Sequence, residues 1–289
     1  MSGIQVMRSS GPSDQGAQWR GGHVTQAMEV AERAAAVLMH RPAGLLTDID
    51  GTISRVTAPP EAATVEPAAR AALARLATVL DVVAVVSGRS AADARRLVDV
   101  PGLVYIGNHG LERWHDGQVT ASPEATRFRD RMARVAAQMQ ATLTLPGVRV
   151  EDKDLTLSIH YRETADPASA EEAVRAALLP VSEAEGLVVR PGRMVFEVRP
   201  PITMNKGTAA RDLIRERGLR SVVFVGDDVT DLDAMTEIQR LAAEQGLRAL
   251  TVGVVGPETP PAIAEQADMT VDGVDGVIAF LTALADRLG

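Results

Sequence analysis

The chain of 289 residues contains no cysteine and only five histidines. The missing thiols exclude disulfide bonds, thiolate metal sites and cysteine nucleophiles, so a metal site would have to rely mainly on carboxylates. The absence of cysteine is also compatible with a reducing compartment, and we expect a cytoplasmic protein.

Long apolar runs and an excess of basic residues are missing too. No apolar stretch approaches the roughly 18 residues that suggest a membrane span, so we expect no membrane association. The net charge is −8 and the pI is about 5.2, and no basic run interleaved with aromatic residues occurs, which argues against a nucleic-acid surface. Residues 1–22 are rich in Gly, Ser and Gln without the apolar core of a signal peptide, so we expect a disordered tail.

The composition favours a globular protein of two domains. Hydrophobic residues make up 46% of the chain and charged residues 24%, which is enough to bury a substantial core. After a helical pattern over 27–38, short apolar runs alternate with helical patterns up to about 106 and again beyond 200. This alternation predicts an α/β fold with a parallel sheet, whose ligand site lies at the carboxyl ends of the strands.

Two aspartates, Asp48 and Asp50, follow the first apolar run in the sequence LLTDIDGT. A strand places residues i and i+2 on the same side, so both carboxylates can meet one target. Because two close anions repel, the arrangement favours a bound divalent cation or a shared proton, as in a phosphoryl-transfer site. Alone, the same segment would also fit a capped turn that closes a buried strand.

A second acidic group follows the apolar run 221–226. It consists of Asp227, Asp228 and Asp231, which stand at the carboxyl end of a second predicted strand. Taken alone, the pattern also fits a helix N-terminus, where acidic side chains suit the helix dipole. Two acidic strand ends in one α/β chain favour a shared functional site.

Two further segments offer partners for phosphate oxygens. The apolar run 82–86 ends in Ser87, Gly88 and Arg89, which supply a hydroxyl, backbone N–H groups and a cation, although a simple strand-to-helix turn is the alternative. Lys206 opens a later helical pattern, where its charge can neutralise a phosphate. A lone lysine would otherwise be a solvated surface side chain.

The order of these motifs, DxDGT, SGR, a lysine and GDDxTD, resembles the haloacid dehalogenase (HAD) superfamily of phosphatases. From about Leu45 to the C-terminus the chain is further similar to the trehalose-6-phosphate phosphatases. The segments that carry this similarity are Gly107–Gly110, Val150–Lys153, Ser158–Arg162, Pro191–Pro200 and Asn205–Gly207. The resemblance implies a Rossmann-like HAD core with a parallel sheet and an inserted, smaller α/β cap domain of the C2 type.

Two positions depart from the family pattern. Arg193 stands where the family usually has lysine, and Leu232-Asp233 replaces the usual Glu after the last motif. Arginine keeps the positive charge but not the geometry of lysine, so the departure bears on substrate preference more than on the chemistry.

The resemblance implies roles for the acidic residues. Asp48 would be the nucleophile that forms an aspartyl-phosphate, and Asp50 the general acid and base. Mg²⁺ would be the cofactor, held by Asp48, the backbone carbonyl of Asp50 and Asp227, with Asp228 beside them. Asp228 and Asp231 would orient metal-bound waters or the catalytic lysine.

Donors fixed around the phosphoryl group would complete the chemistry. We expect this role for Thr52, Ser87, the backbone at Gly88, and Lys206. Arg89 would either assist them or pair within its own helix.

Alternating apolar and polar residues between about 111 and 199 indicate an inserted α/β unit. We therefore expect a core formed by 23–111 and 200–289, and a cap formed by 112–199 that selects the substrate. The crossings near Leu111 and Pro200-Pro201 are candidate hinges.

Seven residues are expected to contact the sugar. Because Arg193 and Glu197 would project from one face of a strand, we place both at the distal sugar. Each candidate has a structural alternative: an ion pair in solvent, a histidine satisfied within a sheet, or a brace at the hinge. The full set is Asn108, His109, Glu151, Lys153, His160, Arg193 and Glu197.

The resemblance implies a Mg²⁺-dependent phosphatase that releases trehalose from trehalose 6-phosphate. Sucrose 6-phosphate or a glycosyl-phosphoglycerate would suit a similar cap. A sugar-phosphate sensor without activity and a phosphomutase are alternatives of other classes. The sequence leaves open whether a trehalose-6-phosphate synthase binds the protein.

Overall fold

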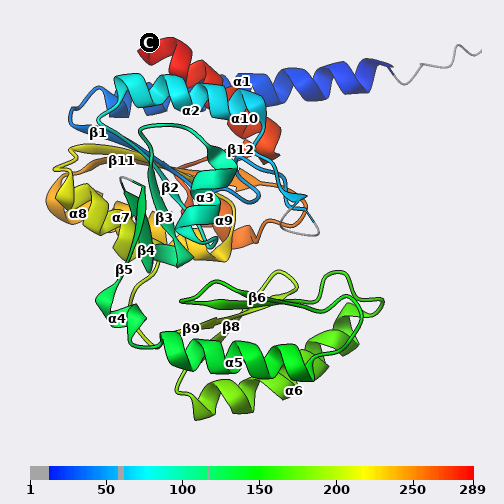
Figure 1. Ribbon diagram of the computed structural model, residues 1–289. Helices are drawn as coiled ribbons and strands as arrows, with labels where there is room; N and C mark the ends of the chain where they lie inside the picture. Colours follow the sequence, from blue (N-terminus) through cyan, green and yellow to red (C-terminus); the bar gives the residue numbers. More distant parts are fainter. Residues whose placement is uncertain (1–12, 58–61, 116) are drawn as a thin grey trace, which may run out of the picture.

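A computed structural model describes residues 13–57, 62–115 and 117–289. Within this part of the chain, helices cover both faces of a large sheet, and a smaller sheet backed by two helices lies against one end of that core (Figure 1). The two units face each other across the carboxyl ends of the central strands, which carry the acidic motifs.

The large sheet has eight strands within the described residues, in the order β12-β11-β10-β1-β2-β3-β4-β5. The strands from β12 to β3 pair in parallel, which confirms the predicted α/β fold with a parallel sheet. Their bounds are β1 Ala43–Thr47, β2 Val82–Val86, β3 Val104–Gly107, β4 Glu112–His115, β5 Gln118–Ala121, β10 Ser221–Gly226, β11 Arg248–Val255 and β12 Met269–Asp272.

Successive residues of the central strands point to opposite sides of the sheet. Leu45 and Val223 pack into one hydrophobic cluster, whereas Leu46 and Phe224 pack into the other. Because both faces are covered by helices, these strands are apolar along their whole length rather than alternating.

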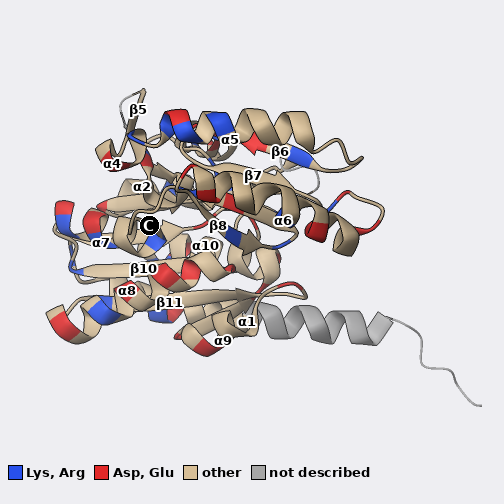
Figure 2. Cartoon of the chain, turned by 90° about the horizontal axis from the view of Figure 1, so that it is seen from below, with Lys and Arg blue, Asp and Glu red and all other residues tan. Residues whose placement is uncertain are grey.

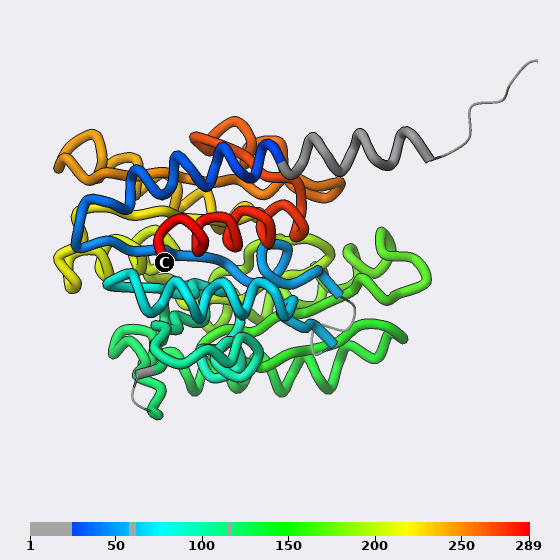
Figure 3. Tube along the Cα trace, turned by 90° about the horizontal axis from the view of Figure 1, so that it is seen from above, coloured from blue at the N-terminus to red at the C-terminus, as the bar shows by residue number. Residues whose placement is uncertain are grey.

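Among the described residues, four helices cover one face of the sheet and three cover the other. The first group is α1 Ser13–Leu38, α2 Pro67–Val79, α3 Ala91–Val98 and α10 Gly273–Leu288, and the second is α7 Lys206–Glu216, α8 Val229–Gln245 and α9 Pro261–Gln266. Helix α10 lies between α1 and α2, as the red, blue and cyan tubes of Figure 3 show. The two layers hold the strands so that the motif residues meet at one edge.

The smaller unit is a four-stranded antiparallel sheet in the order β6-β7-β9-β8. Its strands are β6 Arg149–Asp152, β7 Leu157–His160, β8 Val188–Gly192 and β9 Val195–Arg199, and its helices are α5 Arg129–Thr142 and α6 Pro167–Ala184. Leu157, Ile159 and Phe196 pack under these helices. The opposite face of the sheet is polar and faces the core.

The boundary between the units differs from the expected one at residue 112. The hairpin of β4 and β5 extends the large sheet, because β4 pairs with β3 in antiparallel register. A short helix, α4 Pro123–Thr126, then leads to the smaller unit, capped by Ser122 and with Pro123 in its first turn. Alternation alone could not tell this hairpin from the strands of the insert.

The expected N-terminal tail also differs in part. Residues 13–22 belong to helix α1, whereas residues 1–12 lie outside the described part.

None of the helices in the described residues combines the length and hydropathy that crossing a bilayer would require. Along α5 and α8 acidic and basic side chains are interspersed rather than separated into faces of one sign (Figure 2).

Candidate active site

A cavity of about 710 Å³ lies between the core and the polar face of the smaller sheet. Its walls include Asp48, Ser87 and Lys206 from the core, and Glu151 and Glu197 from the smaller unit. This size suits a small organic ligand. Residues predicted for phosphoryl transfer and residues predicted for sugar binding therefore share this space, whereas Thr52, Asn108 and Asp227 lie outside its lining.

Asp48 directly follows β1 and is buried against Lys206. The Nζ atom of Lys206 lies 2.9 Å from Oδ1 of Asp48 and 2.8 Å from Oδ1 of Asp231. Lys206 is the first residue of α7, whose N-terminus is fixed by a capping box between Asn205 and Thr208. A buried cation is thus held rigidly between two buried carboxylates.

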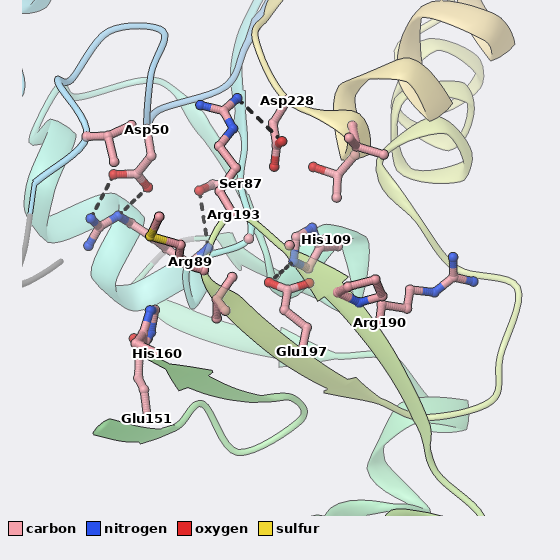
Figure 4. Close-up of a pocket in the computed structure, with 18 of the residues that line it drawn as sticks. Asp50, Ser87, Arg89, His109, Glu151, His160, Arg190, Arg193, Glu197 and Asp228 are labelled. Carbon is pink, nitrogen blue, oxygen red and sulfur yellow. Dashed lines mark hydrogen bonds and ion pairs between the residues drawn. The ribbon is translucent and has the colours of Figure 1, made fainter. Parts of the chain in front are cut away.

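Asp50 points to the opposite wall, where Arg89 binds it through two hydrogen bonds. Arg89 donates from Nε to Oδ2 at 2.7 Å and from Nη2 to Oδ1 at 2.8 Å, and Figure 4 shows this fork. Arg89 also donates to Asp93 in α3 at 2.8 Å. Arg89 therefore pairs both with Asp50 in the cavity and with the first turn of the helix that follows it.

Asp227 follows β10 and is buried beside the turn after β1. Gly51 has φ +89°, and a Cβ atom there would lie 2.2 Å from Oδ2 of Asp227, so the turn requires glycine. Thr52 donates to Oδ1 of Asp227 at 3.0 Å and does not line the cavity. Thr52 was predicted to bind the phosphate, but it instead orients the carboxylate of Asp227.

Asp48, Asp227 and Asp231 form a compact cluster, with one oxygen of each carboxylate lying within 4.8 Å of the others. Burial, and then repulsion from the neighbouring carboxylates, raise the pKa of Asp48 to about 7 although Lys206 lowers it. Burial and the charge of Asp48 likewise raise the pKa of Asp227 to about 7. Oxygen donors that crowd their charges in this way fit Mg²⁺, which prefers such ligands and relieves their repulsion.

The cluster shares Asp48 and Asp227 with the predicted metal set, lacks the carboxylates of Asp50 and Asp228, and adds Asp231. Asp231 belongs to it, but both of its oxygens are already used: Oδ1 by Lys206, and Oδ2 by the N–H groups of Asp227 and Asp228 at 3.1 and 3.0 Å. Asp228 lies outside the cluster at the N-cap of α8. Asp231 therefore serves as the N3 residue of the capping box of α8 and as the partner of Lys206. Asp48 and Asp227 keep the positions suited to a metal.

Ser87, Gly88 and His109 form a packed wall of the cavity. Gly88 lies so close to His109 that a Cβ atom there would be 2.5 Å from Cε1 of the ring. His109 has φ +56°, a strained backbone held by a hydrogen bond from its N–H to the carbonyl of Ser87 at 2.9 Å. The hydroxyl of Ser87 accepts from the N–H of Arg89 at 3.2 Å, which leaves its proton available to a ligand.

Asn108 was predicted to contact substrate, but it joins the two units instead. Its Nδ2 atom donates to the carbonyl of Lys153 at 3.1 Å, and its Oδ1 atom accepts from Thr156 at 2.6 Å. The side chain is fully buried and does not line the cavity. Lys153 adds a hydrogen bond to the carbonyl of Gly88 at 3.1 Å, so these contacts dock the smaller unit on the core.

His109 and Glu197 also connect the units, with Nε2 of His109 lying 3.0 Å from Oε1 of Glu197. Burial disfavours the imidazolium and lowers the pKa of His109 to about 4. A neutral ring facing a carboxylate must donate from that nitrogen, so Nε2 carries the proton. Arg199 binds the other oxygen of Glu197. Glu197 is thus fixed at the cavity wall, as the sequence predicts, although already paired.

Glu151, Lys153 and His160 form a second polar group on the smaller sheet. Nε2 of His160 lies 2.8 Å from Oε2 of Glu151, and Nζ of Lys153 lies 3.7 Å from the same oxygen. Burial acts to raise the pKa of Glu151, but His160 and Lys153 outweigh it and lower that pKa to about 2. All three residues line the cavity.

Arg193 departs from its predicted position. It lies in the turn between β8 and β9 rather than on a strand, so the alternation that placed it beside Glu197 does not apply. Its Nη2 atom lies 2.7 Å from Oδ2 of Asp227 and 3.4 Å from Oδ1 of Asp228. The side chain reaches the end of the cavity where Asp228 lies, which is here called the phosphoryl end because phosphoryl transfer is predicted there (Figure 4).

Several cavity residues escaped the sequence analysis. Arg190 lies opposite Glu197 in the register of β8 and β9, and Arg149 lies opposite His160 in that of β6 and β7. One sequence gives no access to this register. Arg199 could have been found, because it is two residues beyond Glu197 on the same strand face. The charged residues missed are Arg149, Arg162, Glu163, Arg190, Arg199 and Asp233.

The chain is similar to known proteins over most of its length. The family model described as Trehalose-phosphatase matches residues 46–262. The trehalose-phosphate phosphatase of Mycobacterium marinum is 33% identical over 260 residues, covering 83% of this chain and 64% of the relative. An uncharacterized glycosyl hydrolase of Mycobacterium tuberculosis is 37% identical over 226 residues, covering 75% of this chain but 17% of the relative. The chain thus spans less than two thirds of the length of these relatives.

Solved structures show the same fold. A trehalose-6-phosphate phosphatase related protein superposes with a TM-score of 0.71 at 23% identity, covering 84% of this chain and 97% of that one. The C-terminal domain of the C. albicans trehalose-6-phosphate phosphatase gives a TM-score of 0.72 at 20% identity, with 91% and 96% covered. The family match confirms the resemblance drawn from the motifs, and the chain belongs to the trehalose-phosphatase family.

Proposed function

We propose that the protein is a Mg²⁺-dependent phosphatase that hydrolyses trehalose 6-phosphate to trehalose and phosphate through an aspartyl-phosphate. The observation that carries the proposal is the placement of Asp48, which stands at the floor of the two-domain cavity, 2.9 Å from Lys206 and within the carboxylate cluster. The names of the relatives support trehalose 6-phosphate as the substrate.

In this mechanism Asp48 attacks phosphorus and the sugar oxygen leaves. Lys206 orients the carboxylate of Asp48 and offers positive charge to the phosphoryl oxygens, together with the hydroxyl of Ser87. Asp48 and Asp227, with the backbone carbonyl of Asp50, would hold Mg²⁺, which when bound offsets the charge of the carboxylates and phosphate.

Asp50 is the proposed general acid and base. It protonates the leaving oxygen and then takes a proton from the water that hydrolyses the aspartyl-phosphate. Both of its oxygens are bound by Arg89, so one of these hydrogen bonds opens when Asp50 transfers a proton. Arg89 is thereby proposed to fix the orientation of the carboxylate between turnovers.

The smaller sheet is proposed to act as the cap that reads the sugar. Glu151, Lys153, His160 and Glu197 present charged and polar atoms on the wall opposite the acidic cluster, where sugar hydroxyls would replace part of their present pairing. We also propose that the protein acts in the cytoplasm, in keeping with the absence of cysteine.

Removal of divalent cations tests the proposal. Phosphate release from trehalose 6-phosphate should stop in excess chelator and return when Mg²⁺ is added back, and Asp227→Asn should raise the Mg²⁺ concentration that half-saturates the rate. The readout is inorganic phosphate as a function of free Mg²⁺. Full turnover in excess chelator would refute the metal assignment.

A further inference from the structure

Arg193, in the turn between β8 and β9 of the smaller unit, contacts the aspartates that follow β10 in the core. Its Nη2 atom donates to Oδ2 of Asp227 at 2.7 Å and to the backbone carbonyl of Asp227 at 3.0 Å. Figure 4 shows the side chain beside Asp228, on the side of the cavity away from Glu151 and His160. At this position the guanidinium faces the metal carboxylates rather than the sugar-binding wall.

The ion pair with Arg193 neutralises the negative charge of Asp227, which has no other cationic partner in the described residues. Asp227 is 2% exposed and lies among Asp48 and Asp231, whose own cation is Lys206. The remaining partner of the Asp227 carboxylate in the described residues is the neutral hydroxyl of Thr52. Arg193 therefore supplies the positive charge that a divalent cation would otherwise bring to Asp227.

The geometry of the contact is that of a displaceable partner. Arginine and a carboxylate usually pair through two parallel hydrogen bonds, as Arg89 and Asp50 do here. Arg193 uses Nη2 alone, and its Nε atom is buried without a hydrogen-bond partner in the described residues. The pairing with Asp227 thus leaves part of the guanidinium unsatisfied, which is costly in a buried place.

We propose that Arg193 is a positioning residue that neutralises Asp227 and Asp228 in the metal-free protein and is displaced from them when Mg²⁺ binds. Docking of the β8–β9 turn on the core and binding of the metal therefore compete. The proposal rests on the metal-dependent function proposed above. Because the two cations share the oxygens of Asp227, each weakens the binding of the other by the same factor. The released guanidinium remains near the phosphoryl site, where it can pair with the phosphate.

Mg²⁺ binding to the full chain, measured by isothermal titration calorimetry without substrate, tests the proposal. Arg193→Met removes the charge while keeping a long apolar stem, and it should tighten Mg²⁺ binding by between about 5- and 150-fold, the usual range for coupled sites. Arg193→Lys keeps a charge and should bind Mg²⁺ with an affinity closer to that of the wild type. Arg193→Gln provides a second neutral variant if the Met variant does not fold.

Arg190→Gln is the matched control. It removes a cation from β8 in the same cavity, but Arg190 has no ion pair with Asp227, so the Mg²⁺ affinity should change by less than about twofold. Equal tightening by Arg190→Gln and Arg193→Met would show a general charge effect and overturn the proposal. Unchanged affinity in the neutral Arg193 variants would overturn it too.

The same titrations separate this proposal from the proposed function. If wild-type protein binds Mg²⁺ and releases phosphate, but the neutral Arg193 variants bind Mg²⁺ with wild-type affinity, only the role of Arg193 fails. If wild type and all variants fail to bind Mg²⁺, the metal-dependent function fails, and the role of Arg193 fails with it.

Discussion

Asp48→Asn should reduce the turnover of trehalose 6-phosphate by roughly 10³-fold or more, because an amide cannot serve as the nucleophile. Asparagine has nearly the same shape, so the turn after β1 and the packing around it should persist. The measurement is steady-state phosphate release, accompanied by a melting curve. Near-native kcat in a folded Asp48→Asn variant would show that Asp48 is not the nucleophile.

Lys206→Met should destabilise the protein by about 3–5 kcal/mol, the usual cost of removing one partner from a buried ion pair. The variant leaves Asp48 and Asp231, which are 2.9 and 2.8 Å from the ammonium group, buried without their cation. Turnover should fall with stability, because the phosphoryl oxygens lose a fixed charge. Chemical denaturation gives the free energy of unfolding.

The chain provides a close control in Lys153, its one other lysine. Lys153→Met should cost much less, because Glu151 keeps its hydrogen bond to His160. In the Asp48→Asn background, Lys206→Met should also cost less than in the wild type, since one buried carboxylate is gone. Equal stability of wild type and Lys206→Met would show that the buried triad is not held by charge.

The sequence is enough to predict that the core motifs meet at one edge of the sheet, because these motifs are local. Asp48, Ser87, Lys206 and Asp227 each directly follow a strand or begin a helix, and parallel strands bring such positions to one edge. The periodicity of short apolar runs is enough to locate these strands. Because parallel strands all run in the same direction, their carboxyl ends lie at one edge of the sheet. This placement can be predicted without knowing the tertiary contacts.

The direction of individual side chains depends on turns that the sequence does not specify. Arg193 lies outside the strand to which alternation assigns it, and Asn108 turns into the interface because its backbone is left-handed, with φ +47°. Thr52 follows a glycine turn that aims its hydroxyl at Asp227. Cross-strand register hides Arg190 in the same way, because pairing partners are distant in the sequence.

Phosphate release from a panel of sugar phosphates at saturating Mg²⁺ tests the central claim most directly. The panel should contain trehalose 6-phosphate, sucrose 6-phosphate, a glycosyl-phosphoglycerate and glucose 6-phosphate, which lacks the second ring. We expect the highest kcat/KM for trehalose 6-phosphate, because the cap wall is proposed to bind both rings. A higher kcat/KM for any other member of the panel, or no phosphate release from trehalose 6-phosphate, would contradict it.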